Sequence, residues 1–263
     1  MGGLKNRLKK ILGLTSNRQT VLVYSMGKVG STSLYNTLRS TIPDAYVFHS
    51  HFLSDHWLKE RLPAMAEGFH INIKEGERVH RHLANHPTER IKVITLVREP
   101  LIRDLSDVFE NWEYTHPDQD IESVDRDELI RDFHKKNHEY TLTWFDTEFR
   151  AYTGFDIYSQ PFPTERGFAF YKHGPFDILC IKLESLNDCY HEALSNWFGE
   201  GVGNLTTSNE SENKKGSSLY AEMKQNYKAP EEKLDMLYGS KYARHFYSED
   251  ELMSFRKRWS HED

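Results

Sequence analysis

The sequence predicts an α/β fold with three layers, in which helices cover both faces of a central, mainly parallel sheet. Short apolar runs rich in β-branched residues alternate along the chain with longer segments of helical periodicity. These runs are nearly continuous instead of alternating apolar with polar residues, which is typical of strands buried on both faces. No internal repeat interrupts this alternation.

Four segments are predicted to be strands: Thr20–Met26, Asp44–His51, Ile91–Pro100 and Phe176–Leu186. Helical patterns cover Ser31–Ser40, Lys74–His86, Leu101–Trp112, Asp127–Tyr152 (with room for a break), Leu186–Phe198 and Leu219–Trp259. Between the last two lies Gly199–Ser218, which is polar and nearly free of apolar residues, and we expect it to form a long surface loop.

The length of 263 residues suits one large domain, which we place at 20–263, after a basic segment at 1–19. A net charge of −6 argues against general nucleic-acid binding. Cys180 and Cys189 have no short metal-type spacing, so we expect buried, reduced thiols in a cytoplasmic protein.

The segment at 1–14 is the only candidate for membrane contact. It places Leu4, Leu8, Ile11 and Leu12 on one helical face and its lysines elsewhere. Such a helix could lie on the inner membrane surface, or could simply pack on the domain. No apolar run approaches the roughly 20 residues that span a bilayer, and no signal peptide is visible.

A Gly-containing turn follows the first predicted strand, in the sequence VYSMGKVGSTSLYNTL at 23–38. Gly27 and Gly30 permit a tight turn, the hydroxyls that follow can donate, and Lys28 adds a positive charge. A helix that starts after such a turn can bind phosphate through its first N–H groups. No lysine follows Gly30, so the loop of Mg-nucleotide enzymes is absent, and a turn without a ligand remains an alternative.

A second element lies in LVREPLIRDLSDVFEN at 96–111. Arg98 ends the third predicted strand, and Ser106 follows eight residues later on a helix. The carboxyl ends of parallel strands share one sheet edge, so Arg98 should reach the first loop. Together the two side chains suit a second phosphate. Taken alone, this element is explained more simply by an Arg98 that pairs with a carboxylate and a solvated Ser106.

Together, the two elements resemble the family of sulfotransferases that use 3′-phosphoadenosine-5′-phosphosulfate (PAPS). The resemblance is specific for about Thr20–Asn111, and it implies a catalytic role for Lys28 at the 5′-phosphosulfate. It implies that Arg98 and Ser106 bind the 3′-phosphate. It also assigns 5′-phosphosulfate contacts to the loop and the start of its helix, namely Lys28, Val29, Gly30, Ser31, Thr32 and Ser33.

The family also closes a basic Gly-containing loop over the 3′-phosphate. Here NKKGSS at 213–218 is the counterpart, with Lys214, Lys215 and Gly216. The same sequence is equally compatible with two solvated lysines that bind no ligand. WFDTEF at 144–149 and RHFYSEDEL at 244–252 are similar to a bacterial, sulfotransferase-like branch associated with capsular polysaccharide synthesis.

Transfer of a sulfuryl group from PAPS to the hydroxyl or amine of an acceptor, the reaction that the resemblance implies, needs a base to take the acceptor's proton. We expect this base to be His51, with His49 as the second choice. Both lie at the carboxyl end of the second predicted strand and should share a sheet edge with the loop. Glu99 and Glu75 are alternative bases. A metal site at His49, His51 and His56 is disfavoured because no carboxylate or cysteine completes the set, so we expect no metal.

The sequence therefore predicts an enzyme that transfers a sulfuryl group from PAPS to a hydroxyl or amine of a carbohydrate-like acceptor. Two alternatives remain open at this point: a nucleotide or small-molecule kinase, and a non-catalytic relative that keeps the nucleotide pocket.

Overall fold

The computed structural model describes residues 18–65, 70–86, 90–199, 202–205 and 215–261. The amphipathic segment at 1–14 and Lys214 lie outside the described residues, as does the middle of the polar loop predicted at 199–218.

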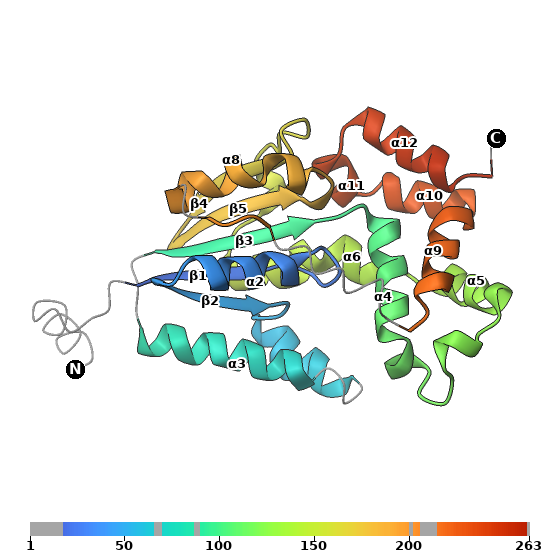
Figure 1. Ribbon diagram of the computed structural model, residues 1–263, viewed down its shortest axis with the longest axis horizontal. Coiled ribbons are helices and arrows are strands. Elements are labelled where there is room, and N and C mark those ends of the chain that lie inside the picture. Colours follow the sequence, from blue (N-terminus) through green and yellow to red (C-terminus); the bar gives the residue numbers. More distant parts are fainter. Residues whose placement is uncertain (1–17, 66–69, 87–89, 200–201, 206–214, 262–263) are drawn as a thin grey trace, which may run out of the picture.

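The described strands form one sheet in the order β2-β1-β3-β5-β4 (Figure 1). Pairings between β1 and β2, β1 and β3, and β3 and β5 are parallel, and β4 pairs antiparallel with β5 at the edge. The bounds are β1 Gln19–Tyr24, β2 Ala45–Ser50, β3 Ile91–Val97, β4 Phe168–His173 and β5 Phe176–Lys182. This mostly parallel sheet confirms the predicted α/β class.

The four predicted strands correspond to β1, β2, β3 and β5, each ending one to four residues before its predicted end. β4 was not predicted, because it is an edge strand whose outer half is largely exposed and which lacks a continuous apolar run. It joins β5 through a two-residue turn at Gly174, where φ is 51°.

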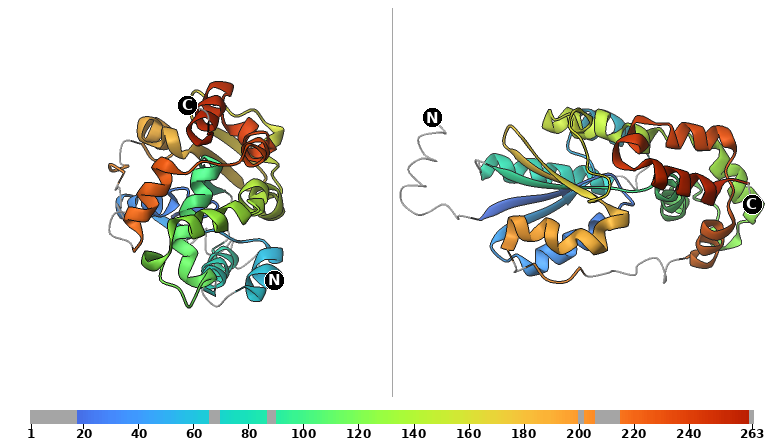
Figure 2. Two further views of the ribbon diagram at one scale, coloured as in Figure 1. Left: turned by 90° about the vertical axis from the view of Figure 1, so that its right-hand side faces the viewer. Right: turned by 90° about the horizontal axis from the view of Figure 1, so that it is seen from above.

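Helices cover both faces of the sheet, as Figure 2 shows. α2 (Ser31–Thr41) and α8 (Leu186–Phe198) lie on one face, while α3 (His70–Asn85) lies on the other with the segment that begins at α6. That segment comprises α6 (Glu139–Trp144), the π-helical turn η5 (Phe145–Phe149) and α7 (Arg150–Thr153). The helix expected over Asp127–Tyr152 is indeed broken, because α5 (Arg126–Lys135) ends before His138, whose φ is 57°.

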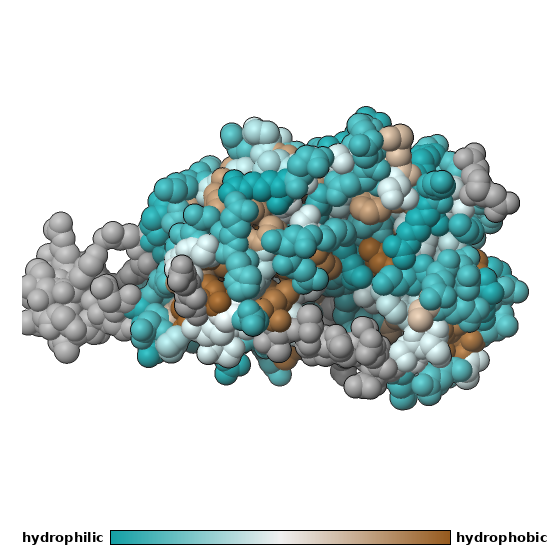
Figure 3. Space-filling model, turned by 45° about the horizontal axis from the view of Figure 1, so that its top comes forward, coloured by the Kyte–Doolittle hydropathy of each residue, from teal (hydrophilic) through white to brown (hydrophobic). Residues whose placement is uncertain are grey.

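The remaining helices gather beyond the carboxyl ends of the parallel strands (Figure 1). They are α4 (Pro100–Thr115), α9 (Ser217–Asn226), α10 (Glu231–Tyr238), α11 (Lys241–Phe246) and α12 (Glu249–Trp259), and the short turn η1 (His56–Arg61) follows β2. The face drawn in Figure 3 is mainly hydrophilic, with small, scattered apolar spots. None of the helices described is long and apolar enough to cross a bilayer.

Both predicted free thiols are confirmed, since Cys180 and Cys189 are buried and unpaired.

A buried carboxylate fixes the chain just after β2. Glu148, in η5, is fully buried and accepts hydrogen bonds from Tyr24 Oη, from the backbone N–H groups of Leu53 and Ser54, and from the Ser54 hydroxyl. An ionised carboxylate can accept this many bonds, and each donor would be costly to bury without an acceptor. Glu148 therefore joins the ends of β1 and β2 to the helical layer beneath them.

We predict that Glu148→Ala lowers the free energy of unfolding by about 3 kcal/mol or more, because several buried donors lose their acceptor at about 1–3 kcal/mol each. Urea denaturation at neutral pH would measure this, with Glu148→Gln as a milder variant that keeps one acceptor oxygen. Glu77→Ala, at an exposed position of α3, is the control and should change stability by less than about 0.5 kcal/mol. Equal losses at positions 148 and 77 would contradict this role.

Candidate functional site

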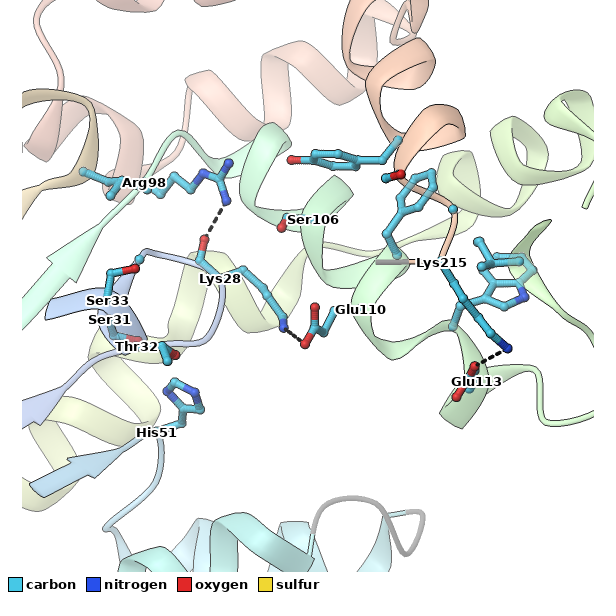
Figure 4. Close-up of a pocket in the computed structure, with 18 residues that line it drawn as sticks. Lys28, Ser31, Thr32, Ser33, His51, Arg98, Ser106, Glu110, Glu113 and Lys215 are labelled. Atoms are coloured by element: carbon cyan, nitrogen blue, oxygen red, sulfur yellow. Dashed lines mark hydrogen bonds and ion pairs between the residues drawn. The ribbon is translucent and has the colours of Figure 1, made fainter. Parts of the chain in front are cut away.

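A cavity of about 500 Å³ opens at the carboxyl ends of the parallel strands (Figure 4). Its walls come from the loop after β1 and the start of α2, the residue after β2, the ends of β3 and β5, one face of α4 and the start of α9. Ligands of open α/β sheets bind at this edge, where crossover connections leave in opposite directions. The lining residues that the sequence singled out are Lys28, Gly30, Ser31, Thr32, Ser33, His51, Arg98, Ser106, Lys215 and Gly216.

The loop after β1 takes two left-handed backbone conformations before α2 begins. Gly30, directly before the helix, has φ 80°, and a Cβ atom there would lie 2.7 Å from Leu183 Cδ1. Both facts require glycine at this position. Lys28 also has a positive φ, 67°, which is uncommon for a residue with a side chain and often marks a functional turn. The side chain of Val29 is fully buried in the core, so this residue can meet a ligand only through its backbone.

Two arginines bind successive carbonyl groups of this loop. Arg103 Nε donates to Gly27 O at 2.9 Å, and Arg98 Nη1 donates to Lys28 O at 2.8 Å. The N–H of Gly27 in turn donates to Tyr140 Oη at 3.4 Å, and the guanidinium of Arg103 lies 4.7 Å from the centre of the Tyr140 ring. With these carbonyls satisfied on the protein side, the start of α2 is left to present N–H groups and hydroxyls to the cavity.

A buried ionic network holds Arg103 in place. Its guanidinium donates to Asp104, Asp107 and the Thr141 hydroxyl, and Asp104 also bonds His138 Nδ1. Burial by itself would raise the pKa of Asp104, but Arg103 and the hydrogen bond from His138 lower it to about 2. The Asp104 carboxylate therefore stays ionised and continues to hold the arginine.

Arg98 stands at the end of β3 in a turn that the C-terminal helices fix. Tyr242 Oη accepts from the N–H of Arg98 at 3.0 Å and donates to its carbonyl at 2.8 Å. The next residue, Glu99, caps α4 by accepting from Leu101 N and Ile102 N, and it also accepts from Tyr238 Oη. Burial raises the pKa of Glu99 to about 7 despite these bonds.

Glu99 and Glu75, the alternative bases, do not line the cavity. The carboxylate of Glu99 is engaged as a helix cap, and Glu75 lies on α3, where burial raises its pKa.

Helix α4 forms a long wall of the cavity. Ser106, Glu110 and Glu113 recur at helical spacing, with Phe109 and Trp112 between them. The ring of Phe109 packs edge-on against Tyr220 of α9, with centroids 5.2 Å apart. The wall thus combines a hydroxyl near Arg98 with an aromatic section farther along the helix.

The ammonium group of Lys28 extends across the cavity to α4, where Nζ lies 3.3 Å from Glu110 Oε1 (Figure 4). Both side chains are partly exposed, at 23% for Lys28 and 37% for Glu110. The lysine therefore points away from the hydroxyls at the start of α2, and it pairs with a carboxylate on the facing helix.

Lys215 and Gly216 reach the cavity from the turn before α9. Gly216 has φ 73°, and a Cβ atom there would lie 3.0 Å from Ile121 Cγ1, so the turn packs closely on the wall. Lys215 Nζ lies 3.4 Å from Asp120 Oδ2 and 3.6 Å from Glu113 Oε1. The charge of Asp120 is the main cause that raises the pKa of Lys215.

His51 is the histidine that lines the cavity. Its Nδ1 lies 2.7 Å from the carbonyl oxygen of Ser25, which can only accept, so Nδ1 carries the proton and Nε2 keeps its lone pair. Burial lowers the pKa of His51 to about 4; the bond to Ser25 opposes this, while the charges of Lys28 and Arg103 add to it. His51 is therefore neutral at pH 7, as a base must be.

His49 supports the start of α2 and is not among the residues that line the cavity. Its Nε2 lies 3.0 Å from the Ser31 hydroxyl, and its ring lies 4.8 Å from that of His51. Burial, assisted by the charge that His51 carries when protonated, lowers the pKa of His49 to about 3. The contact with Ser31 makes it a positioning residue for the loop.

The low pKa values predict acid sensitivity. In the unfolded chain a histidine takes up a proton near pH 6.5, whereas folded His49 does so only near pH 3, so stability falls as pH drops from 6.5 towards 3. Between pH 7.5 and pH 5, His49 should account for a loss of up to about 2 kcal/mol. Urea denaturation of wild type and His49→Gln at both pH values would show a smaller loss in the variant. The comparison at pH 7.5 measures the packing change alone, and parallel pH curves would contradict the linkage.

The described residues include no group of three or more His, Cys, Asp or Glu side chains arranged to hold a metal ion. The third histidine of the metal alternative, His56, is exposed and bonded to Glu60, one turn along η1.

Sequence reasoning missed several residues of the site. Arg103 and Tyr140 hold the loop from behind, Tyr242 fixes Arg98, and Glu110 contacts Lys28. For Arg103 and Glu110 a signal existed, because they lie three residues before and four residues after Ser106, within one helix. The tyrosines come from distant segments, and no local pattern marks them.

Comparison with known families shows a similarity in the second half of the chain. Residues 118–248, just under half of the sequence, match the family model NKWYS, described as "Putative capsular polysaccharide synthesis protein". No match was found among curated proteins or among solved structures. The matched stretch contains Tyr140, Glu148 and Lys215 but not the loop at Lys28, nor Arg98 or Ser106. Over 118–248 the chain is thus similar to the capsular polysaccharide synthesis family that WFDTEF had indicated.

Proposed function

We propose that the protein is a sulfotransferase that moves a sulfuryl group from PAPS to a hydroxyl or amine of a carbohydrate acceptor used in surface polysaccharide synthesis. The observation that carries this proposal is the meeting of the two sequence motifs. The loop at Lys28, the guanidinium of Arg98 and the hydroxyl of Ser106 line one cavity, and Arg98 is bonded directly to the loop. The similarity of residues 118–248 supports the polysaccharide context.

The cavity fits a nucleotide with two phosphate positions. Its volume of about 500 Å³ lies within the range of small-molecule sites, roughly 300 to 1,000 Å³. The start of α2 offers N–H groups and hydroxyls to one anionic group, while Arg98 and Ser106 can bind a second. The aromatic section of the wall, with Phe109 and Tyr220, suits the flat face of a base.

The chain supplies charge stabilisation and a proton acceptor. PAPS would bring a sulfuryl group already activated by its bond to a phosphate. Lys28, on a flexible side chain in the same cavity, can neutralise the leaving phosphate oxygen without a metal ion. His51 presents an unprotonated Nε2, held in that tautomer by Ser25, and can take the proton of the acceptor.

The proposed function is tested first by nucleotide binding. Addition of 3′-phosphoadenosine-5′-phosphate (PAP) without magnesium should raise the melting temperature by several degrees at saturation, as expected for a ligand that binds only the folded state. ATP should raise it much less, because it has no 3′-phosphate for Arg98 and Ser106. Arg98→Ala should remove most of the PAP effect. No stabilisation of the wild type by PAP would overturn both the sulfotransferase proposal and the alternative of a non-catalytic nucleotide-binding relative.

The proposed function is tested next by transfer of the sulfuryl group. With ³⁵S-labelled PAPS and an acceptor mixture of surface glycans, Lys28→Ala should reduce transfer at least about a hundredfold, as for removal of one charge-stabilising group. His51→Gln should reduce kcat by about a hundredfold or more with a small change in PAP affinity. His56→Gln, at an exposed position outside the cavity, is the control and should retain activity. If the wild type binds PAP but neither it nor any variant transfers the label, the result would favour the non-catalytic alternative.

The kinase alternative shares only the fold class with this protein and predicts the opposite ligand preference. Binding of ATP that is tighter than binding of PAP and that requires magnesium would favour a kinase over sulfuryl transfer.

A further inference from the structure

The ion pair between Lys28 and Glu110 occupies the proposed reaction centre. Its two charges come from facing walls, Lys28 from the loop after β1 and Glu110 from α4, and they meet at 3.3 Å within the cavity (Figure 4). A lysine that is to bind a phosphosulfate over the start of α2 cannot keep this orientation. Donor binding must therefore move the ammonium group away from Glu110.

The backbone already gives Lys28 a fixed pivot. Its φ of 67° and the bond from Arg98 to its carbonyl hold the main chain, so that only the side chain is left to swing. The side chain is partly exposed, and rotation about its bonds requires no repacking of the core. The two orientations thus differ in which anion binds the ammonium group: the carboxylate of Glu110 or an anion over the start of α2.

We propose that Glu110 is a positioning residue that competes with the donor and product nucleotide for Lys28. It holds the lysine on the α4 side while the nucleotide site is empty, yields it when a phosphosulfate binds, and takes it back as the bisphosphate product leaves. This inference rests on the proposed function, since it assumes a nucleotide with a 5′-anion at the start of α2. Its consequence is weaker nucleotide binding and faster product release than the same cavity would show without Glu110.

Glu113 offers a matched comparison on the same helix. It lines the same cavity one turn farther along α4, but its cationic partner is Lys215, which also pairs with Asp120. Neutralising Glu113 removes the same charge from the wall and leaves Lys215 held by Asp120. Any effect specific to the Lys28 pair should therefore appear at Glu110 and not at Glu113.

The test is a double-mutant cycle read out by calorimetric titration with PAP. In the wild-type background, Glu110→Gln should tighten PAP binding about two- to fivefold, the size expected for a partly exposed ion pair. In the Lys28→Ala background, Glu110→Gln should change the affinity for PAP no more than Glu113→Gln does in that same background. Product inhibition by PAP should strengthen by the same factor in Glu110→Gln, and Glu110→Asp, which keeps the charge on a shorter side chain, should lie between.

Two results would overturn the inference while leaving the proposed function intact. In the first, Glu110→Gln binds PAP no more tightly than the wild type and has a higher KM for the acceptor. Glu110 would then be an acceptor contact. The other is equal tightening by Glu110→Gln and Glu113→Gln, or tightening that persists without Lys28, which would reflect general repulsion between the wall and the nucleotide. If PAP does not bind the wild type at all, the proposed function and this inference both fall.

Discussion

The site depends on how the loop after β1 disposes of its carbonyl groups. A tight turn before a helix can offer N–H groups to an anion only if the neighbouring carbonyl oxygens, which would repel it, are bonded elsewhere. Arg103 takes the carbonyl of Gly27 and Arg98 takes that of Lys28. The first of these arginines is buried in an ionic network, and the second stands at a strand end. The left-handed conformation at Lys28 is thereby held by partners outside the loop.

Three residues from the second half of the chain support the loop or the segments beside it. Tyr140 accepts from the N–H of Gly27, Tyr242 fixes the Arg98 turn, and Glu148 binds the segment that carries His51. All three lie within 118–248, the stretch that is similar to the capsular polysaccharide synthesis family. The first half thus supplies most of the groups that face the cavity, and the second half adds others from the turn before α9. The scaffold behind them comes from both halves, since Arg98 and Arg103 hold the loop carbonyls.

The layers of the fold and much of the cavity lining could be predicted from the sequence, because both follow from local patterns. Apolar runs such as that of β3 mark buried strands, and parallel strands bring their carboxyl ends to one edge. That rule alone placed Arg98 beside the loop. The edge strand β4 lacks such a run, and the tyrosines behind the loop act through contacts of more than 100 residues in sequence, which no spacing encodes. The charge of Lys28 was evident from the sequence, and helical spacing from Ser106 placed Glu110 on the same face of α4, but no spacing indicated that the two would pair.

The charges around His51 make its basicity depend on what else is bound. Lys28 and Arg103 both add to the burial that lowers its pKa, so the imidazole stays neutral but is a weak base while the cavity holds only protein charges. On the proposed function, the donor brings several negative charges to Lys28 and the start of α2. Those charges offset the nearby cations and raise the affinity of His51 Nε2 for a proton. The same lysine that neutralises the leaving oxygen would thus couple donor binding to the strength of the base, which favours proton removal from the acceptor only after the donor is in place.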